Sequence, residues 1–140
     1  MKLYYFSEMP HHEFPDEEGD RYPSLRLAFP NTFFSPEIAQ RNYQRYLDEY
    51  DAADQAGFDG LMINEHHSTP SCVNVSANMT AGILARTTRN AKLLILGNIL
   101  PIQDNPVQMA EQVAMADLIS GGRVLSGFVR GVGVESWWAN

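Results

Sequence analysis

The chain has 140 residues, of which 44% are apolar and 19% charged, as in an ordinary soluble globular domain. Its net charge of −7 disfavours nucleic acid and anionic membranes as partners, because both bind basic surfaces. The longest strongly apolar stretch, residues 93–100, is too short to span a bilayer, and the only cysteine, Cys72, excludes an intrachain disulfide. We expect a soluble, cytoplasmic protein.

The first part of the chain predicts a strand, a long loop and a helix. Residues 3–7 are rich in aromatic side chains and fit a first strand. Residues 8–36 carry five prolines and an acidic run, which predicts a long loop of the kind that is usually functional or mobile. Ser35–Pro36 is a typical helix start, and apolar residues recur at helical spacing up to Ala53. Gly57 is placed to end this helix in a left-handed conformation.

The rest of the chain alternates strands and helices. We expect strands at residues 58–64, 92–99 and 123–129. One helix runs from Asn74 or Ser76 to about Thr88, and another covers residues 107–119 before Gly121–Gly122. The strands start about 32 residues apart, the size of one βαβ unit. This pattern fits an α/β fold with a parallel sheet, either doubly wound or a (β/α)₈ barrel, and it does not choose between the two.

Glu65–His66–His67 directly follows the second expected strand. The carboxyl ends of parallel strands face the ligand site in both architectures, and histidine is suited to proton transfer near neutral pH. Adjacent side chains diverge, so we expect at most one of the two histidines to face a pocket. The alternative is that a strand-end histidine only binds a loop carbonyl. His11–His12 adds potential metal ligands, but no His-x-His pair or H-E-x-x-H helix is present, so we expect no metal.

Two other strand ends carry candidate residues. Gly97–Asn98 closes the third expected strand, where a glycine either lets a planar ring approach the backbone or eases the turn. Arg130 follows the fourth strand and could pair with a phosphate or carboxylate. The run from Gly131 to Ser136 is a defective dinucleotide fingerprint, and we predict no helix after it. Cys72 has no basic neighbour, so we expect it to be no nucleophile.

Five segments in this order and spacing resemble the luciferase-like flavin-dependent monooxygenases. They are Glu65–His66–His67, residues 96–101, the helix start at 105–111, Asp117–Arg123 and Gly127–Gly131. The resemblance spans essentially the whole chain and implies the (β/α)₈ barrel. Its members are about twice as long, so residues 1–140 correspond to the N-terminal half of a barrel, with only the first four βα units. We therefore expect an incomplete fragment whose open sheet binds flavin poorly, or two copies that complete one barrel.

The resemblance also implies a role for each candidate residue. His66 matches the active-site histidine near the reactive edge of the flavin. Gly97 and Asn98 match the strand end that lies against the flavin ring, in some members through a cis peptide bond, and Arg130 matches an arginine on the phosphate side. Glu65 and His67 would orient His66 or line the pocket. Val129 stands where light-emitting members have a cysteine, which argues against light emission.

The implied reaction uses reduced FMN, usually delivered by a separate flavin reductase, and O₂ to oxidise a small organic substrate. The full-length form would be a homodimer. Three alternatives stay open: hydride transfer with the deazaflavin F420 in the same superfamily, a non-catalytic flavin-binding or partner subunit, and a metal hydrolase on a similar barrel.

Overall fold

The computed structural model describes residues 1–11 and 13–138. Four strands alternate with helices along the chain. In order the elements are β1 (Tyr4–Phe6), α1 (Asp16–Gly19), the 3₁₀ turn η1 (Asn31–Phe33), α2 (Pro36–Gln55), β2 (Gly60–Ile63), α3 (Ala77–Thr87), β3 (Lys92–Ile99), the 3₁₀ turn η2 (Leu100–Ile102), α4 (Pro106–Ser120), β4 (Val124–Val129) and α5 (Val134–Trp138). Within the described residues, no helix is both long and apolar enough to cross a membrane.

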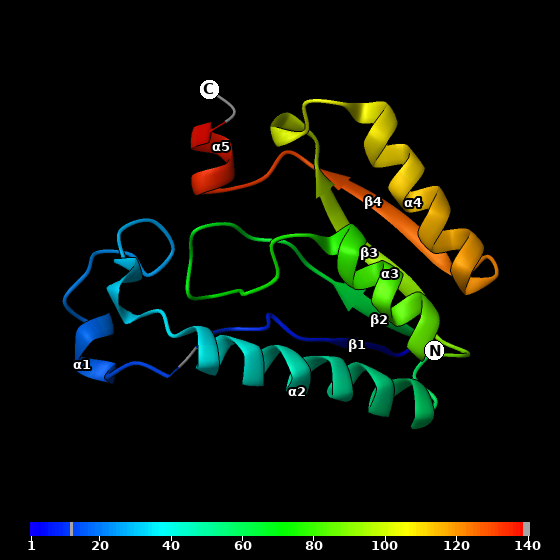
Figure 1. Cartoon of the computed structure of the whole chain (residues 1–140), viewed down its shortest axis with the longest axis horizontal. Helices are drawn as coiled ribbons and strands as arrows, with labels where there is room; N and C mark the ends of the chain where they lie inside the picture. Colours follow the sequence, from blue (N-terminus) through cyan, green and yellow to red (C-terminus); the bar gives the residue numbers. More distant parts are fainter. Residues whose placement is uncertain (12, 139–140) are drawn as a thin grey trace.

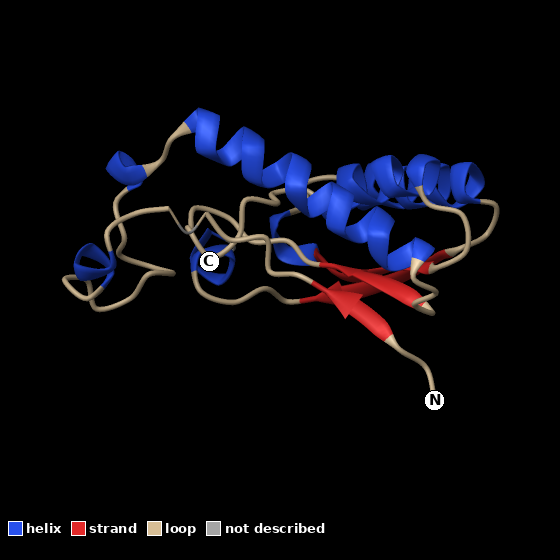
Figure 2. Cartoon of the chain, turned by 90° about the horizontal axis from the view of Figure 1, so that it is seen from below, coloured by secondary structure: helices blue, strands red, loops and turns tan. Residues whose placement is uncertain are grey.

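All four strands are parallel and lie side by side in chain order, β1-β2-β3-β4. Helices α2, α3 and α4 cover one face of this sheet, and its other face is bare (Figure 1, Figure 2). A doubly wound sheet has helices on both faces, whereas a (β/α)₈ barrel has them on the outer face only. The arrangement is therefore that of a partial barrel, which confirms the expected fold class.

The helices begin at the polar residues that the sequence predicts as caps. The Ser35 hydroxyl accepts a hydrogen bond from the Ile38 amide at 3.3 Å, and the Ser76 hydroxyl accepts one from Met79 at 3.3 Å. Asn105 Oδ1 accepts from two amides at the start of α4. Side-chain oxygens at these positions satisfy backbone donors that have no partner inside the helix. Of the two residues expected to cap α3, Ser76 does so.

The main core fills the space between the sheet and its helices. Its largest fully buried members include Tyr50, Leu61, Ile63, Leu84, Leu93 and Ile95. Tyr46 and Tyr50 of α2 belong to this core, and Tyr43 packs against it. Their hydroxyl groups are also bonded: Tyr46 donates to the Pro10 carbonyl and Tyr50 to the Met62 carbonyl, each at 2.8 Å. These bonds tie α2 to the chain just after β1 and to β2.

The amino ends of the strands are held by Asp54 and Arg123. The Asp54 carboxylate accepts hydrogen bonds from three consecutive amides, those of residues 89–91, at 2.7–2.9 Å. Burial raises its pKa, but these donors and the nearby Arg123 outweigh that effect, so the pKa is lowered overall. Arg123 donates to the carbonyls of Ala85, Thr88 and Ala91. This end of the sheet is built for stability.

The bare face of the sheet is apolar. Leu93 and Ile95 point toward the helices, so the residues that alternate with them in β3 point the other way. Phe6, Leu96, Leu125 and Val129 are each 39–40% exposed. β1 and β4 form the two edges of the described sheet. This face corresponds to the inside of a closed barrel, where such side chains would be packed.

Two features differ from the sequence-based expectation. The loop at residues 8–36 contains the single-turn helix α1 and the turn η1, and α5 follows β4 where no helix was expected. Both helices are too short, at four and five residues, to produce a periodic pattern in the sequence. The chain reaches α5 through Gly131 and Gly133, which both have positive φ.

Candidate functional site

A cleft of about 360 Å³ lies at the carboxyl ends of the four strands. We call it the strand-end cleft. Every strand contributes to its wall, either directly or through the residues that follow it. The lining residues are Phe6, Glu8, Asn64, Glu65, His66, Leu96, Gly97, Ile99 and Val129–Val132. Four of the six predicted site residues, Glu65, His66, Gly97 and Arg130, therefore come together in one place, although they are distributed over more than 60 positions of the sequence.

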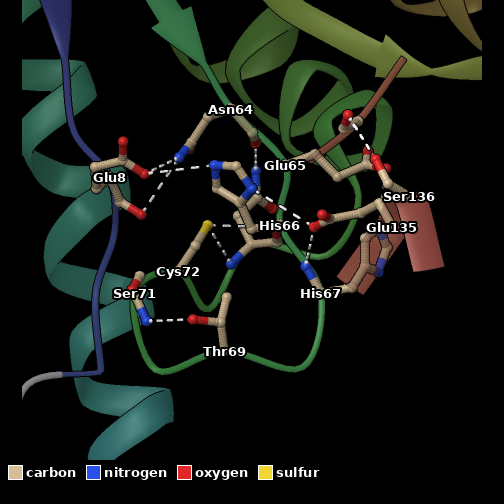
Figure 3. A network of polar contacts seen from close by, with 12 residues as sticks. Glu8, Asn64, Glu65, His66, His67, Thr69, Ser71, Cys72, Glu135 and Ser136 are labelled. Carbon is tan, nitrogen blue, oxygen red and sulfur yellow. Dashed lines mark hydrogen bonds and ion pairs between the residues drawn. The ribbon is translucent and has the colours of Figure 1, made fainter. Parts of the chain in front are cut away.

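His66 lies between two carboxylates (Figure 3). Its Nε2 is 3.7 Å from Glu8 Oε2, and its Nδ1 is 3.5 Å from Glu135 Oε1. The backbone amide of His66 donates to the Asn74 carbonyl at 3.1 Å, which fixes the chain beneath the ring. The side chain is 18% exposed. The ring is thus held on both sides but remains open to the cleft, which suits a group that exchanges a proton with a bound molecule.

Glu65 and His67 form a separate pair. His67 Nε2 lies 3.1 Å from Glu65 Oε1, and Glu65 Oε2 accepts a hydrogen bond from the Ala77 amide at 2.9 Å. Glu65 therefore fastens the loop after β2 to the first turn of α3. His67 is not among the residues that line the cleft, which agrees with the expectation that one of the two histidines faces it.

Glu65 and His67 were expected to orient His66 or to line the pocket, and of these two residues Glu65 lines the cleft. The carboxylates beside the His66 ring belong to Glu8 and Glu135, which the sequence analysis missed. Glu8 also accepts a hydrogen bond from Asn64 Nδ2 at 2.8 Å. No local motif marks either glutamate, because both reach the histidine through the packing of distant segments. A glutamate soon after the first strand is the only signal that sequence reasoning could have used.

Glu135 is 2% exposed and reaches back from α5 to the loop after β2. Its Oε1 accepts a hydrogen bond from the His67 amide at 3.0 Å (Figure 3). Gly131 makes this approach possible. A Cβ atom there would lie 2.9 Å from Glu135 Cβ and 2.7 Å from Ile99 Cγ2, and its φ of 82° suits glycine. The glycines after Arg130 thus place α5 against the histidine loop.

Gly97 lines the cleft, but the position requires a glycine because of packing inside the protein, whether or not a bound ring approaches it. A Cβ at Gly97 would lie 2.4 Å from Val129 Cγ1, so the space beside it is occupied by the neighbouring strand. Asn98 is 1% exposed, does not line the cleft, and its side-chain Oδ1 and Nδ2 have no hydrogen-bond partner among the described residues. The Asn98 side chain is therefore not part of the cleft wall, because the irregular register of β3 and β4 between Ile95 and Asn98 changes which residues face the cleft. That the backbone at Gly97 and Asn98 lies against a flavin ring stays a prediction. No described peptide bond is cis.

Arg130 lies at the exposed rim of the cleft. Within residues 1–11 and 13–138, its guanidinium has no hydrogen-bond or ion-pair partner, so its five donors remain available to an anion. A dinucleotide-binding motif needs a helix whose amino end binds phosphate. At five residues, α5 is too short to serve as that helix, so it does not support a dinucleotide site at the glycines after Arg130.

The remaining candidates do not form a second reactive centre. Burial raises the pKa of the Cys72 thiol to about 11, so this cysteine is protonated at neutral pH, as expected for a residue that is no nucleophile. The described residues bring together no group of three or more His, Cys, Asp or Glu side chains that could hold a metal ion. His11 Nε2 accepts a hydrogen bond from the Ser35 amide at 3.4 Å, and His12 lies outside the described residues.

Residues 26–136 match the family model described as luciferase-like monooxygenase. Over 102 residues the chain is 31% identical to the alkanal monooxygenase beta chain of Vibrio harveyi, covering 73% of this chain and 31% of that protein. It is 25% identical over 107 residues to the oxygenase component of a flavin-dependent trigonelline monooxygenase of Acinetobacter baylyi, covering 69% and 29%. The chain thus spans about a third of the length of these curated relatives.

Two solved structures share the fold. The oxygenating constituent of 3,6-diketocamphane monooxygenase from Pseudomonas putida, in complex with FMN, superposes with a TM-score of 0.68 and 22% identity, covering 79% of this chain and 30% of that one. A monooxygenase from Streptomyces bottropensis superposes with a TM-score of 0.71 and 21% identity, covering 99% and 36%. In both cases the chain aligns with about a third of a larger structure.

Proposed function

The chain belongs to the luciferase-like monooxygenase family. From that premise we propose that the protein to which residues 1–140 belong uses reduced FMN and O₂ to oxidise a small organic substrate. The observation that carries this proposal is the strand-end cleft. It combines an imidazole held between two carboxylates with a free guanidinium, at the edge of the sheet where barrel enzymes place their reactive groups.

The residues of the cleft fit a flavin mononucleotide in two respects. Arg130 supplies a cation with a planar fork of donors that matches a phosphate group. Phe6, Leu96 and Ile99 supply an apolar wall for a planar ring. Arg130 would therefore hold the phosphate side, and the side chains that face away from the helices would hold the ring side. This phosphate contact favours FMN over riboflavin, which has no phosphate, and the FMN complex of the 3,6-diketocamphane monooxygenase constituent supports FMN as the flavin.

In the proposed reaction, the bound flavin supplies the electrons that activate O₂. His66 would donate or accept a proton through Nε2, the ring nitrogen on the side of Glu8, which also lines the cleft. Glu8 and Glu135 hold the imidazole in place from either side, because their carboxylates lie within 3.7 Å of its two nitrogens. Glu65 acts indirectly by fixing the loop that carries both histidines to the start of α3. In a closed barrel, the apolar face beside the cleft would be covered and would keep water away from the reacting groups.

The proposal extends to partners. One relative is named an oxygenase component, which supports a separate reductase that delivers the reduced flavin. The proposed homodimer would offer a place to cover exposed apolar side chains such as Met79 and Ile83, which lie one turn apart on α3 and are 71% and 38% exposed. A single cysteine in a buried position suits the reducing cytoplasm. We propose residues 1–140 as the first half of the barrel domain.

The test supplies reduced FMN, in the absence of O₂, to a purified protein that contains residues 1–140 within a complete barrel. The protein is then mixed with oxygenated buffer and an alkanal, the substrate class in the name of the Vibrio relative. We expect the protein to change the rate at which reduced FMN is oxidised. When the O₂ is isotopically labelled, we expect one labelled oxygen atom in the organic product. Parallel samples with the deazaflavin F420 provide the control. Reaction with F420 and none with FMN would overturn the proposal in favour of hydride transfer.

A further inference from the structure

A second cavity is separate from the strand-end cleft. It has a volume of about 620 Å³ and lies among the loop at residues 8–36, the first turns of α2 and the loop after β2. We call it the loop cavity. Its lining residues are His11, Phe14, Phe29–Asn31, Phe33, Phe34, Ala39, Gln40, Tyr43, Gln44, Ser68–Pro70, Cys72, Val73 and Val75. The two cavities share none of their described lining residues. Its volume is within the range of sites for drug-sized molecules.

Aromatic rings form one wall of the loop cavity. The rings of Phe14 and Phe29 lie 4.6 Å apart, and those of Phe29 and Phe33 are stacked at 5.2 Å. The centroids of the Phe34 and His11 rings lie 5.5 Å apart. These contacts order a segment that otherwise has one turn of α-helix and one of 3₁₀ helix. The wall is therefore built by aromatic packing, and it presents flat apolar surfaces to whatever enters.

No described residue that lines the loop cavity is an aspartate, glutamate, lysine or arginine, although the chain carries 27 such residues. Its deeper polar groups are already bonded within the protein. The Tyr43 hydroxyl contacts Asn74 and Thr80, and Cys72 Sγ contacts the Asn74 carbonyl. A charged ligand would lose its hydration here without gaining an opposite charge, so the lining selects a neutral one.

Gln40 and Gln44 add hydrogen-bonding capacity to this apolar lining. They lie one turn apart on α2, are exposed, and both line the cavity. Their carboxamides can donate to a carbonyl or hydroxyl group of a ligand and can accept from a hydroxyl. An apolar cavity with a few neutral polar groups is the usual composition of a site for an uncharged organic molecule.

Cys72 lies between the two cavities. It lines the loop cavity, and its thiol points toward His66 on the other side (Figure 3).

We propose that the loop cavity is a binding site for a neutral, ring-containing organic molecule, distinct from the strand-end cleft. This inference rests on the cavity itself and does not require the oxidation proposed above.

The test uses two fluorescent probes that differ in charge. N-phenyl-1-naphthylamine is neutral, whereas 8-anilino-1-naphthalenesulfonate carries the same two aromatic groups and a sulfonate. Each is titrated into the purified protein without flavin, so the result is independent of the proposed oxidation. We expect the neutral probe to bind at least about tenfold more tightly than the anionic one, since the described lining contains no lysine or arginine.

Matched variants locate the probe. Ala39 lines the cavity, whereas Ala52 is exposed on the same helix and does not. We expect Ala39→Phe to weaken binding of the neutral probe by about tenfold, because the added ring fills the cavity, and Ala52→Phe to leave it unchanged. Gln44 also lines the cavity but is exposed, so Gln44→Trp adds a ring there without altering the core. This variant is also expected to weaken binding of the neutral probe.

Circular dichroism establishes that each variant is folded. Equal binding of the two probes would overturn the proposal. So would unchanged binding in a folded Ala39→Phe or Gln44→Trp variant, because the probe would then sit elsewhere, for example on the bare face of the sheet. If Ala39→Phe does not fold, Gln44→Trp decides the outcome alone.

Discussion

Nδ1 of His66 lies 3.5 Å from Oε1 of Glu135, a carboxylate that is 2% exposed and comes from the last helix of the described chain. The same oxygen accepts the hydrogen bond from the His67 amide. One buried side chain thus positions the predicted catalytic histidine and the backbone of its neighbour. It connects the loop after β2 to the segment after β4.

Replacement of Glu135 by alanine is expected to loosen this connection. The His67 amide would lose its acceptor, which costs about 1–3 kcal/mol when a buried donor is left unpaired. Hydrogen exchange at His67 should accelerate by roughly tenfold or more. Glu135→Gln retains an acceptor oxygen and serves as the control, with exchange close to that of the unchanged protein. If hydrogen exchange at His67 in Glu135→Ala stayed as slow as in the unchanged protein, Glu135 would not hold this loop.

Replacement of His66 by alanine is expected to reduce turnover with reduced FMN by about 10²–10⁴-fold, the usual contribution of a general acid or base. FMN binding should persist, since His66 is not proposed to hold the cofactor. His67→Ala is the matched control, because His67 does not line the cleft, and a smaller loss is expected. Full turnover of His66→Ala with FMN still bound would remove His66 from the chemistry.

Arg130→Ala tests the phosphate contact. We expect the variant to bind FMN about 10–100-fold more weakly, in line with the loss of a hydrogen bond between charged groups. Riboflavin has the same ring but no phosphate, so its affinity should be nearly unchanged. Fluorescence titration of both flavins against both proteins measures the difference. A parallel loss for FMN and riboflavin would place Arg130 at the ring or in the fold instead.

Asp54 is expected to contribute to stability at neutral pH and to lose this contribution in acid. Its pKa is lowered in the folded state from an ordinary value of 3.8, so its stabilising effect is present above that value. The effect disappears as pH falls through the lowered folded-state pKa. We expect Asp54→Ala to cost roughly 2–4 kcal/mol at neutral pH because three backbone donors lose their acceptor.

Urea unfolding at about pH 7 and about pH 3 measures this change. The difference in unfolding free energy between the variant and the unchanged protein should shrink at the lower pH. A difference that is the same at both pH values would mean that the charge of Asp54 has no part in its effect.

Gly97→Ala is expected to destabilise the sheet by about 1–3 kcal/mol, as overpacking does, because the new Cβ would lie 2.4 Å from Val129 Cγ1. Val129→Ala should relieve part of this cost in the double variant. Gly82→Ala is the control: no atom lies within 4 Å of a Cβ built there, and alanine should stabilise α3 by roughly 0.5–1 kcal/mol. Thermal unfolding of the four variants measures these effects. Additive costs of Gly97→Ala and Val129→Ala would contradict the contact.

Local patterns in the sequence predicted most of the fold. The bounds of β3, Lys92–Ile99, coincide with the predicted strand, and the capping residues Ser35 and Asn105 mark the starts of α2 and α4. These features depend on neighbouring residues, so they are visible in the sequence. The choice of the barrel came from the family resemblance, since the periodicity also fits a doubly wound sheet. The helices on one face of the sheet confirm that choice.

The site was predicted less completely because its contacts join distant segments. His66 and Arg130 follow strands and could be placed at the cleft by topology alone. Glu8 also follows a strand, but nothing in the sequence links Glu8 or Glu135 to His66, because their roles depend on how the loop after β1 and α5 pack on the histidine loop. That Gly97 lines the cleft while the Asn98 side chain is buried could not be predicted, because an irregular register between β3 and β4 shifts the alternation of faces and a sequence does not reveal such a shift.

The hydrogen bond from the His67 amide to Glu135 also bears on the order in which the chain is completed during synthesis. The two residues are 68 positions apart, so at typical translation rates Glu135 is added roughly 3–14 seconds after His67. The acceptor for the amides of residues 89–91, Asp54, is already present when they are made. We therefore expect the layer of helices over β2 and β3 to form first. The histidine loop would acquire its final shape only when the end of the described chain leaves the ribosome.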